Sequence, residues 1–258
     1  MKKGATDRLS AITETERALR HTLSARLNNL LDYFEYLEET VLIALENSNK
    51  PFHISSDKNN PLLLAVVATS RSVSIAKAAM DMALSGHPLE AIALTRVLAE
   101  IAQCTQYLVR HPDSIDRFIS GSLKLDRILK AAKAELPAGS RGSFGRFRGI
   151  ASEYSHASPD LLSIALSIEG PLLKAPVIVT DVDRAEDAAH GIAVTLLGQY
   201  FTFRLTLRGA IDPLAQLAER DTMLFDPENA HAILTEGVID DAQLREMMTA
   251  LTTNVGPA

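Results

Sequence analysis

The sequence has no tryptophan, a single cysteine and few aromatic residues, which make up 5% of its 258 positions. Because the only cysteine is Cys104, an intrachain disulfide is excluded. Cys104 lies in an apolar stretch of helical pattern, so a buried, unreactive thiol is favoured over a nucleophile. Strands prefer aromatic and β-branched side chains, whereas alanine and leucine, which are abundant here, suit helices. The composition therefore predicts a predominantly helical protein.

The sequence also lacks a segment suited to crossing a membrane. Its N-terminal residues are polar and contain no apolar core of a signal peptide. The apolar run from Pro61 to Leu84 is interrupted by Arg71, Lys77 and Asp81, and the run from Gly191 to Phe203 is too short. We therefore expect a cytoplasmic protein that does not contact a membrane.

Charge is distributed unevenly along the chain, whose formal net charge is -6. The window from Asp116 to Arg148 holds eight basic and three acidic residues, so it carries +5 and the rest of the chain carries -11. The stretch from Asp212 to Glu246 is correspondingly acidic. Such segregation can steer an anionic partner toward the basic window, although a solvated helix face explains it as well. The basic residues are Arg117, Lys124, Arg127, Lys130, Lys133, Arg141, Arg146 and Arg148.

Hydrophobic periodicity predicts one long helix within residues 1–46, running from about Asp7 to Glu46. Its apolar residues recur mostly at steps of three and four. This near-heptad spacing suits a helix that packs along a bundle or against a second subunit.

Proline-marked turns separate the next three expected helices. Asn60-Pro61 is typical of a helix start, and the second helix should end near Ser85. His87-Pro88 begins a third helix that ends near Arg110, and a fourth should run from about Asp113 to Leu136. Because the turns are short, these helices should be antiparallel neighbours.

The rest of the chain predicts a small hairpin, a long helix and a short helical C-terminal unit. Alternation and β-branching at 163–168 and 177–180 indicate a hairpin. A helix from about Asp183 to Arg208 contains Gly191 and Gly198, each costing about 1 kcal/mol relative to alanine. Close contact with a neighbouring helix would account for them. We therefore predict an all-α helical bundle over 1–210, with a small β-hairpin insertion at 163–180, and a helical unit over 211–258.

A first candidate site lies on the third helix. Arg96, Glu100, Gln103 and Tyr107 fall within about 60° of one another on a helical projection. They form either an exposed polar face or a polar groove in which Glu100 holds Arg96 toward an anion. The opposite face is apolar and comprises Leu94, Val97, Leu98, Ile101 and Leu108.

A second candidate site lies between residues 146 and 156. This segment combines Arg146, Arg148, Tyr154, Ser155 and His156. Histidine exchanges a proton near neutral pH, and arginine stabilises the charge on a phosphate. Together they would suit phosphodiester cleavage in which a ribose 2′-hydroxyl is the nucleophile, a reaction that requires no metal. Alternatively, the histidine only caps a helix C-terminus.

A carboxylate stands three residues before a histidine at three places, a spacing that ferritin-like bundles use for metal ions. Such pairs also stabilise helices without metal, and no further carboxylate is placed to complete a site. We therefore predict no metal and no cofactor. The pairs are Glu153/His156, Asp187/His190 and Glu228/His231.

The Arg96-x3-Glu100 helix followed by Tyr154-Ser155-His156 resembles an uncharacterised family of bacterial helical proteins over roughly residues 60–210. More loosely, Arg148 and His156 resemble the HEPN superfamily, whose signature is an arginine, four to six residues and a histidine. Here seven residues separate the two. This resemblance implies a small helical bundle, usually dimeric, and a metal-independent ribonuclease of a toxin or antiphage system.

Two functional hypotheses follow. The first is a HEPN-like RNA-binding or RNA-cleaving protein with Arg148 and His156 as catalytic residues and Arg96, Glu100 and Tyr107 among the binding residues. The second is a non-catalytic helical protein-interaction module. In either case we expect a homodimer in which the first helix or the glycine-containing helix takes part, and we leave open whether the protein is an enzyme.

Overall fold

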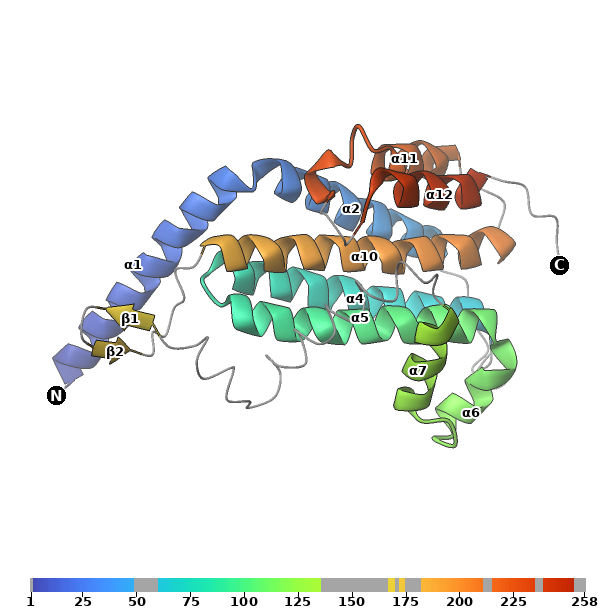
Figure 1. Cartoon of the computed structure of the whole chain (residues 1–258), viewed down its shortest axis with the longest axis horizontal. Coiled ribbons are helices and arrows are strands. Elements are labelled where there is room, and N and C mark those ends of the chain that lie inside the picture. The colour runs from blue at the N-terminus through green and yellow to red at the C-terminus, as the bar shows by residue number, and fades with distance from the viewer. Residues whose placement is uncertain are drawn as a thin grey trace.

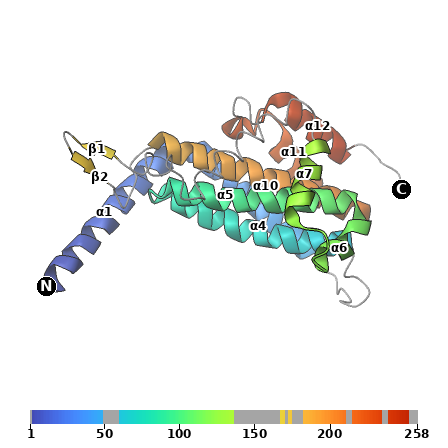
Figure 2. The same cartoon turned by 60° about the horizontal axis from the view of Figure 1, so that its bottom comes forward.

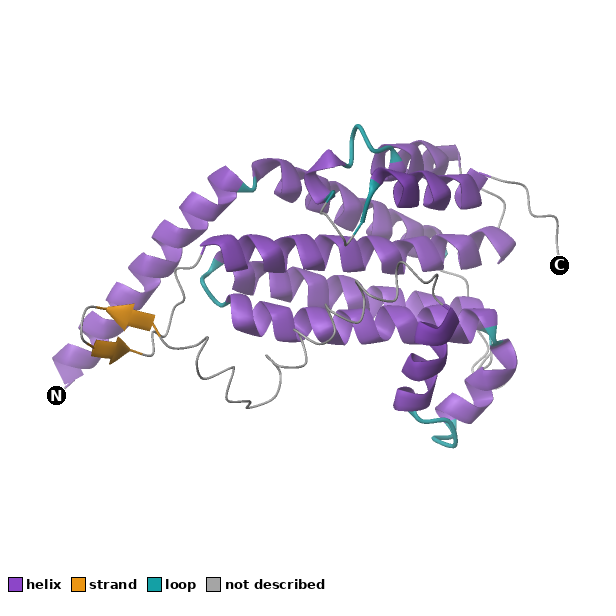
Figure 3. Cartoon of the chain, viewed as in Figure 1, coloured by secondary structure: helices purple, strands orange, loops and turns teal. Residues whose placement is uncertain are grey.

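A computed structural model describes residues 2–48, 60–135, 167–169, 172–174, 182–210, 215–234 and 239–252. Helices dominate these residues, which confirms the all-α fold class (Figure 3). The α-helices are α1 (Lys2–Arg26), α2 (Asn28–Asn47), α4 (Pro61–Leu84), α5 (Pro88–Arg110), α6 (Ile115–Ile119), α7 (Leu125–Glu135), α10 (Val182–Ala210), α11 (Ala215–Phe225) and α12 (Asp241–Thr252). Two 3₁₀ turns, η1 (Pro112–Ser114) and η2 (His231–Ile233), accompany them.

Four long helices, α2, α4, α5 and α10, form the bundle (Figure 1). Helix α4 runs antiparallel to α5, whereas α10 runs parallel to α5, so that α5 and α10 end at the same end of the bundle (Figure 1). One continuous core of buried side chains joins these helices to α11 and α12. Its largest fully enclosed members include Tyr200, Phe203, Phe225, Leu37 and Leu98.

Helices α6 and α7 pack on the C-terminal half of α5 and project from the bundle (Figures 1 and 2). A separate small core holds them there, formed by Cys104, Leu108, Ile115, Leu123 and Ile128. Helix α7 is amphipathic, since Ile128, Leu129 and Ala132 are buried while its charged residues face solvent.

The expected helix starts are confirmed for α4 and α5. The side chain of Asn60 accepts a hydrogen bond from the Leu62 amide at 2.8 Å, and Pro61 occupies the first helical position. Helix α4 closes at Gly86, whose φ of 87° requires a residue without a side chain. Helix α5 then spans Pro88–Arg110, as the sequence predicts.

Two predicted helices are broken in the structure. The first is divided at Leu27 into α1 and α2, and Figure 1 shows the chain bending there. Leu27 is buried at this bend, beyond which α2 runs along the bundle. The two residues that follow it are asparagines, which have low helix propensity. The fourth predicted helix is divided into η1, α6 and α7, because Gly121 adopts a φ of 75° between two serines.

The later elements agree in part with expectation. Helix α10 spans Val182–Ala210, close to the predicted 183–208. Strands β1 (Ser167–Glu169) and β2 (Leu172–Lys174) pair antiparallel, with Ile168 opposite Leu173. Residues 163–166 and 177–180 of the expected hairpin lie outside the described residues, so this insertion stays a prediction. Helices α11 and α12 follow and pack against α2 and α10.

Helix α4 is the one described helix that is long and apolar enough to span a membrane, with a mean hydropathy of 1.4 in its most apolar window. Half of this window is buried against other helices, which is equally typical of a core helix in a bundle.

Candidate functional site

The Arg96–Glu100 pair forms on α5 as the spacing predicts. Arg96 Nε donates to Glu100 Oε1 at 3.0 Å, and the two side chains are 20% and 21% exposed. The ion pair is therefore half-buried, which strengthens it relative to a fully solvated pair. It can hold the guanidinium in one orientation on the surface of the bundle.

The remainder of the predicted polar face of α5 does not form one site with this pair. Gln103 is buried, and its Oε1 has no hydrogen-bond partner among the described residues. Tyr107 lies about 16 Å farther along the helix axis than Arg96, where its ring contacts that of His111 at 4.5 Å between centroids. Of this face, the contacts among the described residues join Arg96 to Glu100.

The predicted apolar face of α5 also requires correction. Val97, expected in the apolar face, is 43% exposed, whereas Ala99 and Gln103 on the polar side are buried. The reason is that α5 packs against both α4 and α10, so its buried surface is wider than one stripe and is rotated from the face that hydrophobicity alone indicates.

The second predicted site lies outside the described residues. These omit 136–166, and with them Arg146, Arg148, Tyr154, Ser155 and His156. Whether Arg148 and His156 converge on one point therefore stays a prediction.

The exposed cations of α6, α7 and the turn between them form what we call the α7 basic surface. In the described part of the chain, none of these cations forms an ion pair with another side chain. Burial of Ile128 and Leu129 on the opposite side anchors α7 and turns its lysines outward. The members of this surface are Arg117, Lys124, Arg127, Lys130 and Lys133.

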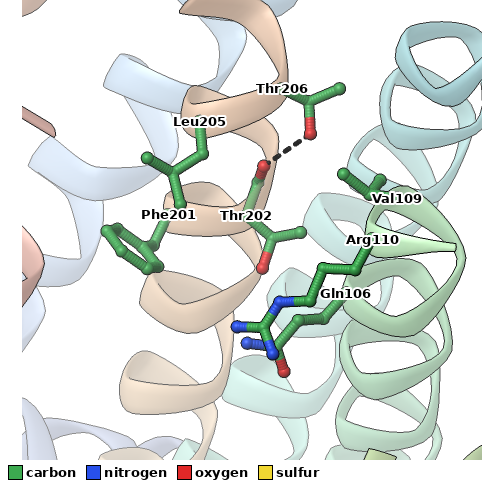
Figure 4. Close-up of a pocket in the computed structure, with 7 residues that line it drawn as sticks. All are labelled: Gln106, Val109, Arg110, Phe201, Thr202, Leu205 and Thr206. Atoms are coloured by element: carbon green, nitrogen blue, oxygen red, sulfur yellow. Dashed lines mark hydrogen bonds between the residues drawn. The ribbon is translucent and has the colours of Figure 1, made fainter. Parts of the chain in front are cut away.

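A groove of about 210 Å³ lies between the C-terminal ends of α5 and α10 (Figure 4). Figure 4 shows the guanidinium of Arg110 and the amide of Gln106 side by side, near the hydroxyl of Thr202. Its volume is below that of typical pockets for small-molecule ligands, which begin at roughly 300 Å³. Sequence reasoning missed the groove because its walls come from distant segments. It is lined by Gln106, Val109, Arg110, Phe201, Thr202, Leu205 and Thr206.

Beside the groove, α5 and α7 are joined by a surface cluster. His111 Nε2 lies 2.8 Å from Glu135 Oε1, and Arg110 Nη1 lies 3.7 Å from Glu135 Oε2. The longer distance is outside hydrogen-bond range, so Arg110 is held only loosely.

A buried polar cluster, also missed by sequence reasoning, lies where α10 meets α11. Tyr200 donates to Asp221 Oδ1 at 2.6 Å, and Arg204 Nε lies 3.0 Å from Asp221 Oδ2. Burial raises the pKa of the Asp221 carboxyl, while Tyr200 and Arg204 partly oppose this effect. Since all three side chains are enclosed, the cluster has no access to a ligand.

Two further side chains with reactive atoms, Cys104 and His190, are also not free. Cys104 is buried as expected, and burial raises its thiol pKa to about 11. His190 lies with Nδ1 3.0 Å from the Glu186 carbonyl and Nε2 3.1 Å from the Ala232 carbonyl. Within the described ranges, no three His, Cys, Asp or Glu side chains gather as metal ligands.

Comparison with known proteins adds no family: no family model, curated protein or solved structure matches this chain.

Proposed function

We propose that this protein binds single-stranded RNA through the α7 basic surface. The observation that carries the proposal is a set of five exposed cations on and beside one anchored helix, none paired with a described carboxylate. Lys130 and Lys133 are one turn apart on α7, a spacing that allows both to contact one phosphate backbone. The acidic remainder of the chain would confine RNA to this surface.

Cleavage is the second part of the proposal and rests on the resemblance to HEPN ribonucleases. The 2′-hydroxyl would attack the adjacent phosphorus and expel the 5′-oxygen of the next nucleotide, leaving a 2′,3′-cyclic phosphate. His156 would take the proton of the attacking hydroxyl, water would protonate the departing 5′-oxygen, and Arg148 would stabilise the charge on the phosphate. We also propose that residues 163–180, which follow the basic window along the chain, form a β-hairpin insertion.

RNA binding is tested by fluorescence anisotropy with a labelled, unstructured RNA at several salt concentrations. Lys130→Ala and Lys133→Ala should each weaken binding and lower the slope of log affinity against log salt by about 0.7, the release expected for one phosphate of a single strand. The matched control is Lys77→Ala on α4, whose ammonium is paired with Glu38 at 3.1 Å and should not contribute. Absence of binding at low salt, or an equal effect of Lys77→Ala, would contradict the proposal.

Cleavage is tested separately, by gel analysis of the same RNA. His156→Ala should abolish cleavage and leave binding largely intact, whereas Arg148→Ala should weaken both. If wild-type protein binds RNA but leaves it whole, the catalytic part of the proposal is wrong and the binding part stands.

A second candidate function is that of a non-catalytic helical interaction module. The observation that favours it is that two partly exposed apolar side chains of α10, Phe201 and Leu205, line the groove.

A further inference from the structure

The turn that joins α6 to α7 is bounded by two exposed apolar side chains. Ile119, the last residue of α6, is 57% exposed, and Leu125, the first residue of α7, is 38% exposed. In Figure 1 this turn lies at the outer end of the projection that the two helices form. We call the two side chains the apolar tip. Single exposed apolar residues are common on protein surfaces, so the significance of this pair depends on its surroundings.

Hydrogen bonds within the turn hold the apolar tip in one conformation. The carbonyl oxygen of Arg117 accepts from the Leu123 amide at 2.7 Å and from the Ser122 hydroxyl at 3.0 Å. The Gly121 amide donates to the Phe118 carbonyl at 3.0 Å, and Leu123 is buried in the small core beneath the turn. Because a preformed surface loses little conformational entropy on binding, the tip is suited to contact a partner.

Cations of the α7 basic surface flank the apolar tip. Arg117 lies two residues before Ile119. Lys124 and Arg127 stand on either side of Leu125, one residue before it and two residues after it. All three cations are exposed, and among the described residues none of them forms an ion pair. The tip therefore presents an apolar contact and positive charge together, which fits a partner that has both an apolar surface and negative charge.

The direction in which the cations follow one another favours a flexible strand over a flat anionic surface such as a membrane. Helix α7 runs from the tip back toward α5, where Glu135 Oε1 lies 2.8 Å from His111 Nε2. The basic residues along it recur at three-residue steps, which are about 4.5 Å along a helix axis. A bilayer that touches the tip would contact only the nearest of them, whereas a strand can follow α7 and reach each in turn. They are Lys124, Arg127, Lys130 and Lys133.

Unpaired bases are the apolar surface that such a strand offers. Each nucleotide of a single strand joins a charged phosphate to a base whose faces are accessible when no partner strand covers them. Isoleucine and leucine are among the side chains that nucleic-acid-binding proteins insert between bases. In a duplex the bases are paired and stacked, so the tip would meet only sugars and phosphates.

We infer that the apolar tip is the base-contacting part of the RNA site, with an unpaired base lying against Ile119 and Leu125. The phosphates next to this base then lie along the cations of α7. This inference rests on the proposed RNA binding and adds which part of the RNA is recognised besides its charge. Charge alone would favour a duplex, which has the higher charge density, whereas the tip favours strands and loops with unpaired bases.

Contact with bases is tested by fluorescence anisotropy of the full chain with three labelled probes of equal length. These are an unstructured RNA, an oligomer of abasic ribose phosphates and an RNA duplex. The double variant Ile119→Ser/Leu125→Ser should bind the unstructured RNA roughly tenfold more weakly than wild type. The slope of log affinity against log salt should not change, because no phosphate contact is lost. The affinity for the abasic oligomer should equal that of wild type.

Two controls accompany the serine variant. Ile119→Met/Leu125→Met keeps an apolar tip and should bind the unstructured RNA as wild type does. Val67→Ser removes an apolar side chain of α4 that is 60% exposed, and it should leave RNA affinity unchanged. Circular dichroism shows whether each variant retains its fold. Should the serine variant unfold, the comparison of the abasic oligomer with the unstructured RNA on wild-type protein decides instead.

Equal affinity of wild type for the abasic oligomer and the unstructured RNA overturns the inference, and so does a folded serine variant that binds this RNA as tightly as wild type. In both cases Lys130→Ala would still weaken binding, so the proposed RNA binding stands. If none of the three probes binds at low salt, RNA binding itself fails. Wild-type binding to vesicles of phosphatidylserine and phosphatidylcholine that the serine variant loses, with its RNA affinity unchanged, would assign the tip to a membrane and also overturn the inference.

Discussion

Three polar side chains are enclosed where α10 meets α11, and their burial has an energetic consequence. Arg204 and Asp221 are 5% and 4% exposed at their side chains, so solvent hardly screens their attraction. The Arg204 Nε–H nevertheless forms no hydrogen bond with the described residues. It lies only 3.0 Å from Asp221 Oδ2, but its N–H bond does not point at that oxygen. The pair therefore compensates its desolvation incompletely.

Removing both partners of this pair should destabilise the protein less than the sum of the two single removals. Asp221→Asn keeps the hydrogen bond from Tyr200 but leaves a buried guanidinium, and Arg204→Met leaves a buried carboxylate. Arg204→Met should lower the free energy of unfolding by about 3 kcal/mol, and Asp221→Asn should lower it by less, because burial already disfavours the charged carboxylate. The double variant should lose clearly less than the sum. Urea unfolding of all four proteins gives the coupling, and strict additivity would show that the two charges do not interact.

The same carboxyl should make stability depend on pH. Burial raises the pKa of Asp221 in the folded state above its unfolded value, which is about 3.9. The folded state thus holds this proton more tightly, so the stabilisation is full below the unfolded pKa and is lost as pH rises through the folded pKa. The difference in unfolding free energy between wild type and Asp221→Asn should be largest in acid and shrink toward neutrality. A difference that is constant between pH 4 and 7 would contradict this.

At the scale of elements, the sequence predicts helices well where a residue with a fixed backbone preference marks the boundary. Asn60-Pro61 and His87-Pro88 set the starts of α4 and α5, and both are found as expected. The bend at Leu27 has no proline or glycine to announce it, because it arises when buried leucines turn α2 onto the bundle. Gly121 was visible in the sequence, but its left-handed conformation depends on how α7 folds back against α5.

At two glycines, the effect of backbone conformation on the free energy of unfolding can be separated from the effect of side-chain packing. At Gly121 and at Gly198 an added Cβ would meet nothing within 4 Å, so alanine clashes at neither. Gly198 is helical, and alanine there should raise the free energy of unfolding of the monomer by up to about 1 kcal/mol. Gly121 has a φ of 75°, and alanine there should lower it by about 1 kcal/mol. Thermal unfolding at dilute concentration should therefore shift in opposite directions; shifts of one sign would refute this account.

One arginine of α11, Arg220, contacts several side chains of α2. Arg220 Nη1 lies 3.0 Å from Glu39 Oε2 and 3.1 Å from Thr40 Oγ1, and its guanidinium lies 4.9 Å from the centre of the Tyr36 ring. Arg220→Met keeps the aliphatic stem and removes these contacts, and should cost about 1 to 2 kcal/mol of unfolding free energy. Glu39→Gln is the comparison: Glu39 is 58% exposed, so its loss should cost under about 1 kcal/mol. If chemical denaturation shows that Arg220→Met and Glu39→Gln lower the free energy of unfolding equally, the stabilisation comes from the ion pair alone.

At the scale of the whole molecule, the candidate sites were only partly accessible to sequence reasoning. The Arg96–Glu100 contact was predictable, since residues four apart on a helix are neighbours. The groove and the Arg204–Asp221 pair were not, because each joins segments whose proximity depends on the packing of entire helices. Gly198 was noticed, but the expected close neighbour is absent from the described residues around it.

The parallel arrangement of α5 and α10 has a consequence for the field around the groove. Each helix carries a partial negative charge at its C-terminal end, and two such ends lie together here, opposed by the N-terminal end of the antiparallel α4 (Figure 1). Arg110 and Arg208, in the last turns of the two helices, offset this potential. The groove should consequently attract small free anions less strongly than the presence of Arg110 alone suggests.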